Sequence, residues 1–303
     1  GNRFENDHIE SDDGAWEEIA RIDPDFEPKR IATETLEDHS QSIITSNQSP
    51  DIGFSHSLNP YRGCEHGCSY CYARPYHEYL GMNSGIDFES RIMVKSRAAE
   101  LLEETLAKPS WKPVSLACSG VTDCYQPVER SKRITRSCLE VLRDFRNPVG
   151  IITKNALVTR DIDVLQGLAS HDAALVGLSI TSLDADLAGK LEPRASRPSA
   201  RLRAMKELSD AGSPVGVSVA PIIPGLNDHE IPAIMEAAAD HGASFASGTV
   251  LRLPYAVSDL FSHWLEEHFP QRKEMILGRV RELRGGRLND AGVGTRMTGT
   301  GAL

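Results

Sequence analysis

Short apolar runs alternate with longer amphipathic stretches from about residue 53 onward, and this alternation restricts the chain to few folds. Runs rich in Val, Ile and other apolar residues predict buried strands, and stretches with helical periodicity predict helices. The predicted strands span 54–59, 114–118, 149–153, 174–180, 215–222 and 245–253. The predicted helices span 95–107, 131–144, 161–170, 198–211, 228–241 and 258–268. Six strand–helix units in strict alternation predict an α/β fold with a parallel sheet and right-handed crossovers.

Polar residues gather at the ends of the predicted strands, and their position distinguishes two architectures. Such a sheet is either open and doubly wound or part of a barrel, and in a barrel the functional residues follow the C-terminal strand ends. The stretches "SGVTD", "KN" and "SITS" lie at the ends of the second, third and fourth strands, whereas the turns that lead into strands carry mainly Gly and Pro. Helix capping would also place Ser, Thr and Asp there. Capping does not explain the cysteines after the first strand. The polar strand ends and these cysteines together therefore favour a functional face of the barrel kind, and we expect a partial (β/α)6 barrel of the TIM type.

Three of the six cysteines, Cys64, Cys68 and Cys71, lie within eight residues directly after the first predicted strand. Crowded thiols in a chain of low cysteine content indicate a metal site rather than a disulfide framework. A structural zinc site needs four ligands, for which His66 and His77 are the nearby candidates. A [4Fe–4S] cluster is normally held by four thiolates, so that three would leave one iron open for another ligand. The residues alone leave both kinds of site open.

The pattern Cys64-x3-Cys68-x-Tyr70-Cys71, after the first strand of a six-unit α/β chain, resembles the radical S-adenosylmethionine superfamily. The resemblance implies that the three cysteines bind a [4Fe–4S] cluster whose open iron chelates S-adenosylmethionine. It further implies that an electron donor such as flavodoxin or ferredoxin reduces the cluster, and that a 5′-deoxyadenosyl radical then abstracts hydrogen from a substrate. The other cysteines are too scattered to hold a further cluster, so we expect a single one.

The same resemblance assigns residues to S-adenosylmethionine. Members of the superfamily often hold the amino group of the cofactor with a Gly-Gly-Glu-like stretch after the second strand. The matching region here lacks the glutamate, and its polar substitutes are Ser119, Thr122 and Asp123. Lys154, after the third strand, is expected to pair with the methionine carboxylate as a point charge.

Two further pairs of residues are candidates for the cofactor site. Ser179 and Thr181, at the end of the fourth predicted strand, are expected to hydrogen-bond the ribose, although either side chain could simply satisfy the strand end. Glu192 and Arg194, in "LEPRASRP", could bind cofactor or substrate, or could equally form an ion pair within their loop.

A longer set of matches resembles one branch of the superfamily, the spore photoproduct lyase-like or DNA repair photolyase-like proteins. The matching stretches lie within residues 58–228 and are "NPYRGCEHGCSYCYAR", "TDCYQPVE", "TKNALVTRDIDVL", "SITSLD", "LEPRASRPSARL" and "APIIPGLND". This resemblance implies a carbon–carbon lyase that acts on a damaged or modified nucleobase in DNA. It also makes Tyr70 and Tyr72 candidates for hydrogen-atom relay. Cys118, and less directly Cys124, are candidate hydrogen donors, although a free cysteine is often only a small buried apolar residue.

The charge distribution divides the chain into three parts. Residues 1–40 hold 13 Asp and Glu against 4 Lys and Arg, so most of the net charge of −10 lies there. We therefore expect an acidic N-terminal extension at 1–50, the barrel core at 51–270, and a basic C-terminal helix and tail at 271–303. Two groups of cations could hold nucleic-acid phosphates or could be solvated helix faces. They are Arg130, Lys132, Arg133 and Arg136, and Arg272, Lys273, Arg279, Arg281, Arg284 and Arg287.

The alternatives that stay open concern the substrate and the class of protein. The same radical chemistry could act on a small molecule or a peptide, and a zinc-binding module without catalysis is the alternative from a different class. The chain has no run of 18 or more apolar residues, so no membrane span is expected. Because no secretion signal is visible and the cysteines suit a reducing compartment, we expect a cytoplasmic protein. The sequence does not specify the oligomeric state.

Overall fold

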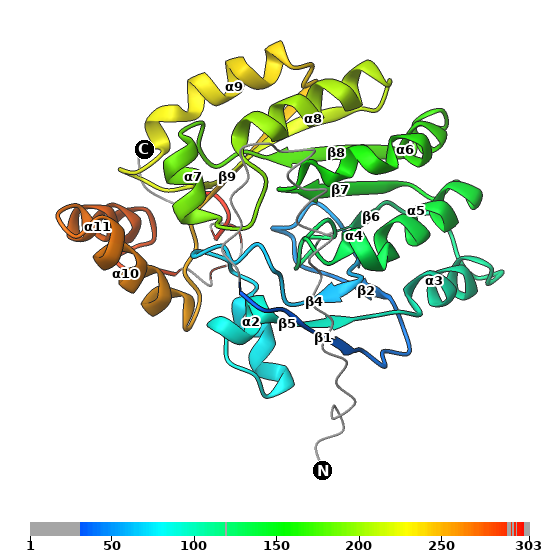
Figure 1. The fold of residues 1–303 in the computed structure, drawn as a ribbon, viewed down its shortest axis with the longest axis horizontal. Coiled ribbons are helices and arrows are strands. Elements are labelled where there is room, and N and C mark those ends of the chain that lie inside the picture. The colour runs from blue at the N-terminus through cyan, green and yellow to red at the C-terminus, as the bar shows by residue number, and fades with distance from the viewer. Residues whose placement is uncertain (1–30, 119, 290–291, 293, 295, 300–303) are drawn as a thin grey trace.

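Six parallel strands form one side-by-side series in the computed structural model, which describes residues 31–118, 120–289, 292, 294 and 296–299 (Figure 1). They are β3 (His56–Leu58), β6 (Leu116–Cys118), β7 (Val149–Thr153), β8 (Ala174–Ser179), β9 (Val215–Ile222) and β10 (Phe245–Val250). Each pairs with the next in chain order, and β2 (Ile44–Ser46) adds an antiparallel edge beside β3. A doubly wound sheet would reverse its strand order at a switch point. The uninterrupted order therefore confirms the partial (β/α)6 barrel.

Helices cover the outer face of this sheet. All six predicted helices are present, as α3 (Ala98–Leu106), α5 (Ile134–Asp144), α6 (Ile162–Ala169), α8 (Pro198–Asp210), α9 (Ile231–Asp240) and α10 (Val257–His268). In α5, Leu139 and Leu142 pack with Val149 and Ile151 of the sheet in the main hydrophobic core. The helices thus bury one apolar stripe each, as their periodicity predicts.

A second, smaller sheet holds the start of the cysteine loop. Its strands are β1 (Glu34–Glu37), β4 (Tyr61–Arg62) and β5 (Arg91–Val94), in the order β1-β5-β4. Tyr61 pairs with Val94 and Arg62 with Met93, so the residues just before Cys64 are fixed against a strand that follows the loop. None of these three strands is predicted from the sequence, and β1 and β2 show that part of the predicted extension pairs with the fold. The boundary at residue 50 stays a prediction.

Short helices connect the larger elements. They are η1 (Arg74–Leu80), α2 (Ile86–Ser90), α4 (Glu129–Lys132), η2 (Ala156–Asp161), α7 (Ala185–Leu191) and η3 (Asp228–Glu230). At the C-terminal side, α11 (Lys273–Leu283) packs against α10, away from α3, α5 and α6 (Figure 1). None of the helices in the described part of the chain has the length and apolar character that a membrane crossing requires.

The β9–β10 pair supplies a test of the fold. Gly216 lies opposite Phe245, and a Cβ at this glycine would lie 2.4 Å from the carbonyl oxygen of Phe245. We expect Gly216→Ala to lower the free energy of unfolding by about 1–3 kcal/mol, because the strands must separate to admit a methyl group. Gly150→Ala, in β7, is the matched control, since nothing lies within 4 Å of its Cβ position. Urea denaturation measures both, and equal stability of the two variants would contradict the packing described here.

Candidate active site

The cysteine loop runs from β4 to η1 and keeps its three thiols free and close to the barrel. Cys64 and Cys68 are buried, Cys71 is half-buried, and none forms a disulfide. The backbone N–H of Cys64 donates to the carbonyl oxygen of Phe88 at 2.8 Å, and that of Cys71 donates to the carbonyl oxygen of Cys68 at 3.3 Å. The three thiols therefore sit on a tightly turned segment whose start is fixed by α2.

Two glycines allow this turn. Gly63 has φ +81° and Gly67 has φ +66°, a left-handed conformation that other residues adopt only with strain. A Cβ would also lie 2.9 Å from the carbonyl oxygen of Phe88 at Gly63, and 2.0 Å from a carboxylate oxygen of Glu89 at Gly67. Both positions next to a cysteine therefore require glycine.

The side chain of Arg74 anchors the cysteine loop to a second segment of the chain, a role that is not predicted from the sequence. Its buried guanidinium donates hydrogen bonds at 2.8 to 3.1 Å to four backbone carbonyl oxygens, those of Gly67, Cys68, Ser84 and Gly85. These acceptors come from two segments that only the folded chain brings together. The only local signal is an arginine three residues after the third cysteine.

The chemistry of the three thiols fits an iron–sulfur cluster. Burial raises the pKa of each thiol, so isolated thiolates at these positions would need a compensating positive charge, which bound iron supplies. Among the residues that the structure describes, no three His, Cys, Asp or Glu side chains converge to hold a single metal ion. In a [4Fe–4S] cluster each thiolate binds a different iron, so separated sulfurs suit it.

The two histidines considered as zinc ligands have other partners. The Nδ1 of His66 lies 3.3 Å from a carboxylate oxygen of Asp123. The Nε2 of His77 lies 3.0 Å from the carbonyl oxygen of Arg91. Within the described part of the chain, neither imidazole joins the thiols in a group of three or more potential metal ligands.

A buried carboxylate joins the cysteine loop to the strand ends. The hydroxyls of Tyr70 and Thr181 both donate to Glu192, whose side chain is fully buried, and Arg201 pairs with its second oxygen. The Nζ of Lys154 lies 3.3 Å from Glu192 and donates to the carbonyl oxygen of Ala220 at 3.0 Å. We call Tyr70, Lys154, Thr181, Glu192 and Arg201 the Glu192 network.

The charged groups of the Glu192 network determine whether the carboxyl group of Glu192 is ionised. Burial alone would raise the pKa of Glu192, but Arg201 and Lys154 outweigh it and hold that pKa well below its usual range. Cys68 and Tyr70 of the network belong to one hydrophobic cluster, so the network lies beside the second thiol. Burial and then the charge of Glu192 raise the pKa of Cys68, and Lys154 lowers it. Arg201 is absent from the sequence-based site because nothing in its helical surroundings marks it as a site residue.

The carboxylate of Asp123 connects the cysteine loop to two of the strand ends. One carboxylate oxygen accepts hydrogen bonds from the Thr153 hydroxyl at 2.7 Å and from the N–H of Tyr125 at 2.9 Å, and the other accepts from the N–H of Lys154 at 2.8 Å. With its contact to His66, this aspartate links the ends of β6 and β7 to the cysteine loop. Its predicted role in holding the cofactor stays a prediction.

The remaining residues proposed for the cofactor lie in different surroundings. The Thr122 hydroxyl donates to the carbonyl oxygen of Tyr61 at 2.8 Å, so it anchors β4, and Ser119 lies outside the described residues. Ser179 is buried, and its carbonyl oxygen accepts a hydrogen bond from Arg201 at 2.8 Å. The side chain of Arg194 is fully buried and pairs with Glu89 at 3.2 Å rather than with its loop neighbour Glu192.

The candidate hydrogen-transfer residues are divided between two environments. Cys118 and Cys124 are buried in the main hydrophobic core with Cys138. Tyr70 is buried in the Glu192 network, whereas Tyr72 is 45% exposed and donates to the carbonyl oxygen of Gly120 at 2.9 Å. The structure thus brings both tyrosines to the cysteine loop and keeps the two cysteines among apolar side chains.

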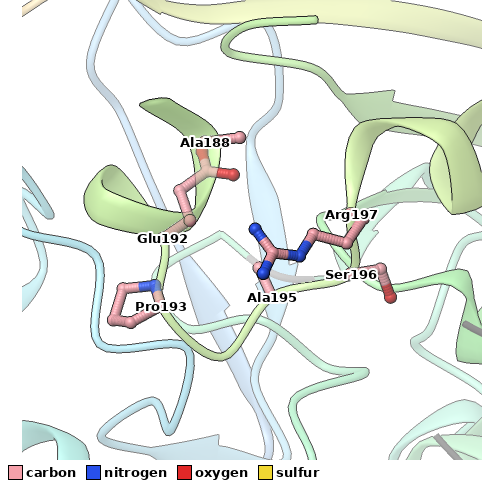
Figure 2. Close-up of a pocket in the computed structure, with 7 residues that line it drawn as sticks. Ala188, Glu192, Pro193, Ala195, Ser196 and Arg197 are labelled. Atoms are coloured by element: carbon pink, nitrogen blue, oxygen red, sulfur yellow. The ribbon is translucent and has the colours of Figure 1, made fainter. Parts of the chain in front are cut away.

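A small pocket lies between α7 and the start of α8. Figure 2 shows Glu192 on one side of it and the guanidinium of Arg197 reaching into it from the other. The lining residues are Ala188, Gly189, Glu192, Pro193, Ala195, Ser196 and Arg197. Because none of the three cysteines lines this pocket, we do not assign it to the cluster or to S-adenosylmethionine.

Residues 58–238 match the family profile of the radical SAM superfamily. The chain belongs to this superfamily. Its cofactors are accordingly a [4Fe–4S] cluster and S-adenosylmethionine. An uncharacterized protein of Mycobacterium tuberculosis is 32% identical over 77% of this chain and 68% of its own length. An uncharacterized protein of Methanocaldococcus jannaschii is 30% identical over 75% of this chain and 82% of its own length.

Solved structures of spore photoproduct lyase share the fold. The complex of that enzyme with dinucleoside spore photoproduct matches with a TM-score of 0.57 and 16% identity, over 78% of this chain and 66% of that one. A variant of the same enzyme matches with a TM-score of 0.59 and 14% identity, over 87% of this chain and 72% of that one. The predicted likeness to the spore photoproduct lyase branch is thereby confirmed at the level of the fold.

We expect Cys64→Ala, Cys68→Ala and Cys71→Ala each to prevent retention of the cluster, because each thiolate binds a different iron. The measurement is iron and acid-labile sulfide per chain after anaerobic reconstitution, with the visible absorbance of the cluster. Cys138→Ala is the matched control, since Cys138 lies in the main hydrophobic core. Full cluster content in any of the three variants would remove that cysteine from the ligand set.

Proposed function

We propose that this radical SAM enzyme abstracts a hydrogen atom from a damaged or modified nucleobase in DNA, in a lyase-type reaction like that of spore photoproduct lyase. The observation that supports it best is the cysteine loop with its two tyrosines, held by the Glu192 network at the strand ends of a barrel that shares the fold of that enzyme. A buried centre of this kind can confine a reactive radical, because polar side chains around it are paired and water is largely excluded.

The three cysteines would hold the cluster, and S-adenosylmethionine would occupy the open iron position. When bound, these groups together supply the 5′-deoxyadenosyl radical. Lys154 would hold the methionine carboxylate, since its ammonium already lies beside the cysteine loop, 5.8 Å from the ring centre of Tyr70. Glu192 and Arg201 would fix the position of that lysine.

Three cations of the two basic groups named in the sequence have partners within the fold. Arg136 pairs with Asp161 and Asp163, and Lys273 pairs with Glu266. Arg284 is buried and donates to backbone carbonyl oxygens at the end of β10. These three cations serve the fold, and a role of the other cations of the two groups in phosphate contacts stays a prediction. A small molecule or a peptide is the alternative substrate for the same chemistry.

The proposal is tested by anaerobic reconstitution and incubation with dithionite and S-adenosylmethionine. We expect 5′-deoxyadenosine to form, and DNA that carries methylene-bridged thymine dimers to be altered, both detected by mass spectrometry. A protein that yields no 5′-deoxyadenosine would overturn the radical chemistry. Formation of 5′-deoxyadenosine without any change in the DNA would instead favour the small-molecule or peptide alternative.

Lys154→Met should weaken S-adenosylmethionine binding about ten- to a hundredfold, because a charge-assisted hydrogen bond contributes about 1.5–3 kcal/mol. Isothermal titration of the reconstituted protein under nitrogen measures the affinity. Lys190→Met is the matched control, since the ammonium of Lys190 pairs with Asp186 on the surface of α7. Unchanged affinity in Lys154→Met would show that this lysine supports the fold rather than the cofactor.

A further inference from the structure

The loops that follow the first and the last parallel strands meet at the mouth of the barrel. Cys68 and Tyr70 pack in one hydrophobic cluster with Leu251 and Leu253, which follow β10. Arg252 lies between these two buried leucines and is half-exposed. The segment that carries the cluster ligands thus packs against the segment that carries Arg252.

Three tyrosines that follow the third cysteine are exposed. Tyr72, Tyr76 and Tyr79 are 45%, 54% and 86% exposed, and the ring centres of Tyr76 and Tyr79 are 6.4 Å apart. Single exposed aromatic residues are ordinary on protein surfaces. Here three exposed tyrosines lie within eight residues, and the first of them directly follows a cluster ligand. Together they expose more aromatic surface than a soluble protein ordinarily presents.

The positive charge beside these rings is only partly compensated. The Nε of Arg252 is buried and has no hydrogen-bond partner among the described residues, and its Nη1 meets only the sulfur of Met297, a weak acceptor, at 3.3 Å. Arg296 is nearby and pairs with Asp51 at 2.7 Å. Burial and then the charge of Arg296 lower the pKa of Arg252, whereas Tyr72, Tyr76 and Asp51 act on it in the opposite sense.

We propose that Tyr72, Tyr76, Tyr79 and Arg252 form the substrate-docking surface of this enzyme, and that it receives a single-stranded or extruded segment of nucleic acid. Exposed rings can stack on bases, and an arginine with an unsatisfied N–H can bind a phosphate oxygen. An acidic peptide would use the charge but not the rings. A base must also leave the duplex to reach a buried centre, which a stacking surface at the mouth assists.

This assignment rests on the proposed function, because it concerns the substrate of the same centre. Its test is a binding measurement on the reconstituted protein and does not require radical chemistry. The probe is a fluorescein-labelled single-stranded thymidine decamer, and fluorescence anisotropy is measured at several salt concentrations. An abasic decamer with the same phosphates and an oligoglutamate of equal charge are the comparison ligands.

We expect Tyr76→Ala to weaken thymidine decamer binding about tenfold and to leave abasic decamer binding unchanged, because only a base can stack. Tyr76→Phe should restore the affinity. Arg252→Ala should weaken both decamers and reduce the slope of log affinity against log salt by about 0.7, the effect of one lost phosphate contact. Phe145→Ala and Arg143→Ala are the controls, since both residues lie near the end of α5, at the opposite end of the strands.

The outcomes separate the alternatives. Equal decamer affinity in the wild type, Tyr76→Ala and Arg252→Ala would overturn the docking surface, as would an equal loss in the control variants. Oligoglutamate binding as tight as decamer binding would overturn the nucleic-acid assignment. Thermal melting of each variant identifies any loss that comes from unfolding, and in that case Tyr76→Phe and Arg252→Lys carry the test. Decamer binding by a protein that makes no 5′-deoxyadenosine would sink the radical proposal but not the docking surface.

Discussion

The buried carboxylate of Glu192 is the point on which the site depends. It accepts hydrogen bonds from the cysteine loop through Tyr70 and from the end of β8 through Thr181, and it pairs with Lys154 after β7. A charge removed from water costs several kcal/mol unless it is paired and hydrogen-bonded. Because Arg201 and Lys154 supply two cations, the carboxylate stays ionised and can hold four side chains in one arrangement.

A buried network of charged groups contributes little net stability to a fold. Buried ion pairs are often no more stabilising than apolar residues of the same volume, while the loss of one partner is strongly destabilising. The barrel already has a continuous core between its sheet and helices. The Glu192 network is therefore better explained by the need to keep a lysine and a tyrosine fixed beside the thiols than by the stability of the fold.

The sequence predicts the barrel well because its strands and helices carry strong local patterns. The predicted bounds of 149–153 and 215–222 coincide with β7 and β9. The small sheet was missed because β4 has two residues and β1 is a short, acidic strand, so neither has a readable period. Arg74 and Arg201 were missed for another reason. Their partners lie in other segments, and no local pattern distinguishes a buried arginine from an exposed one.

The seam of the barrel, where the loops after its first and last parallel strands meet, carries the proposed substrate surface. A sheet of six parallel strands that does not close brings the loops after its first and last strands to the same opening, and Leu251 and Leu253 pack there against Cys68 and Tyr70. Arginines on helices can find carboxylates on neighbouring helices, as Arg136 does with Asp163. Arg252 lies between two buried leucines, and the nearby carboxylate of Asp51 already pairs with Arg296 at 2.7 Å, so part of the charge of Arg252 is left for a ligand that enters at the seam.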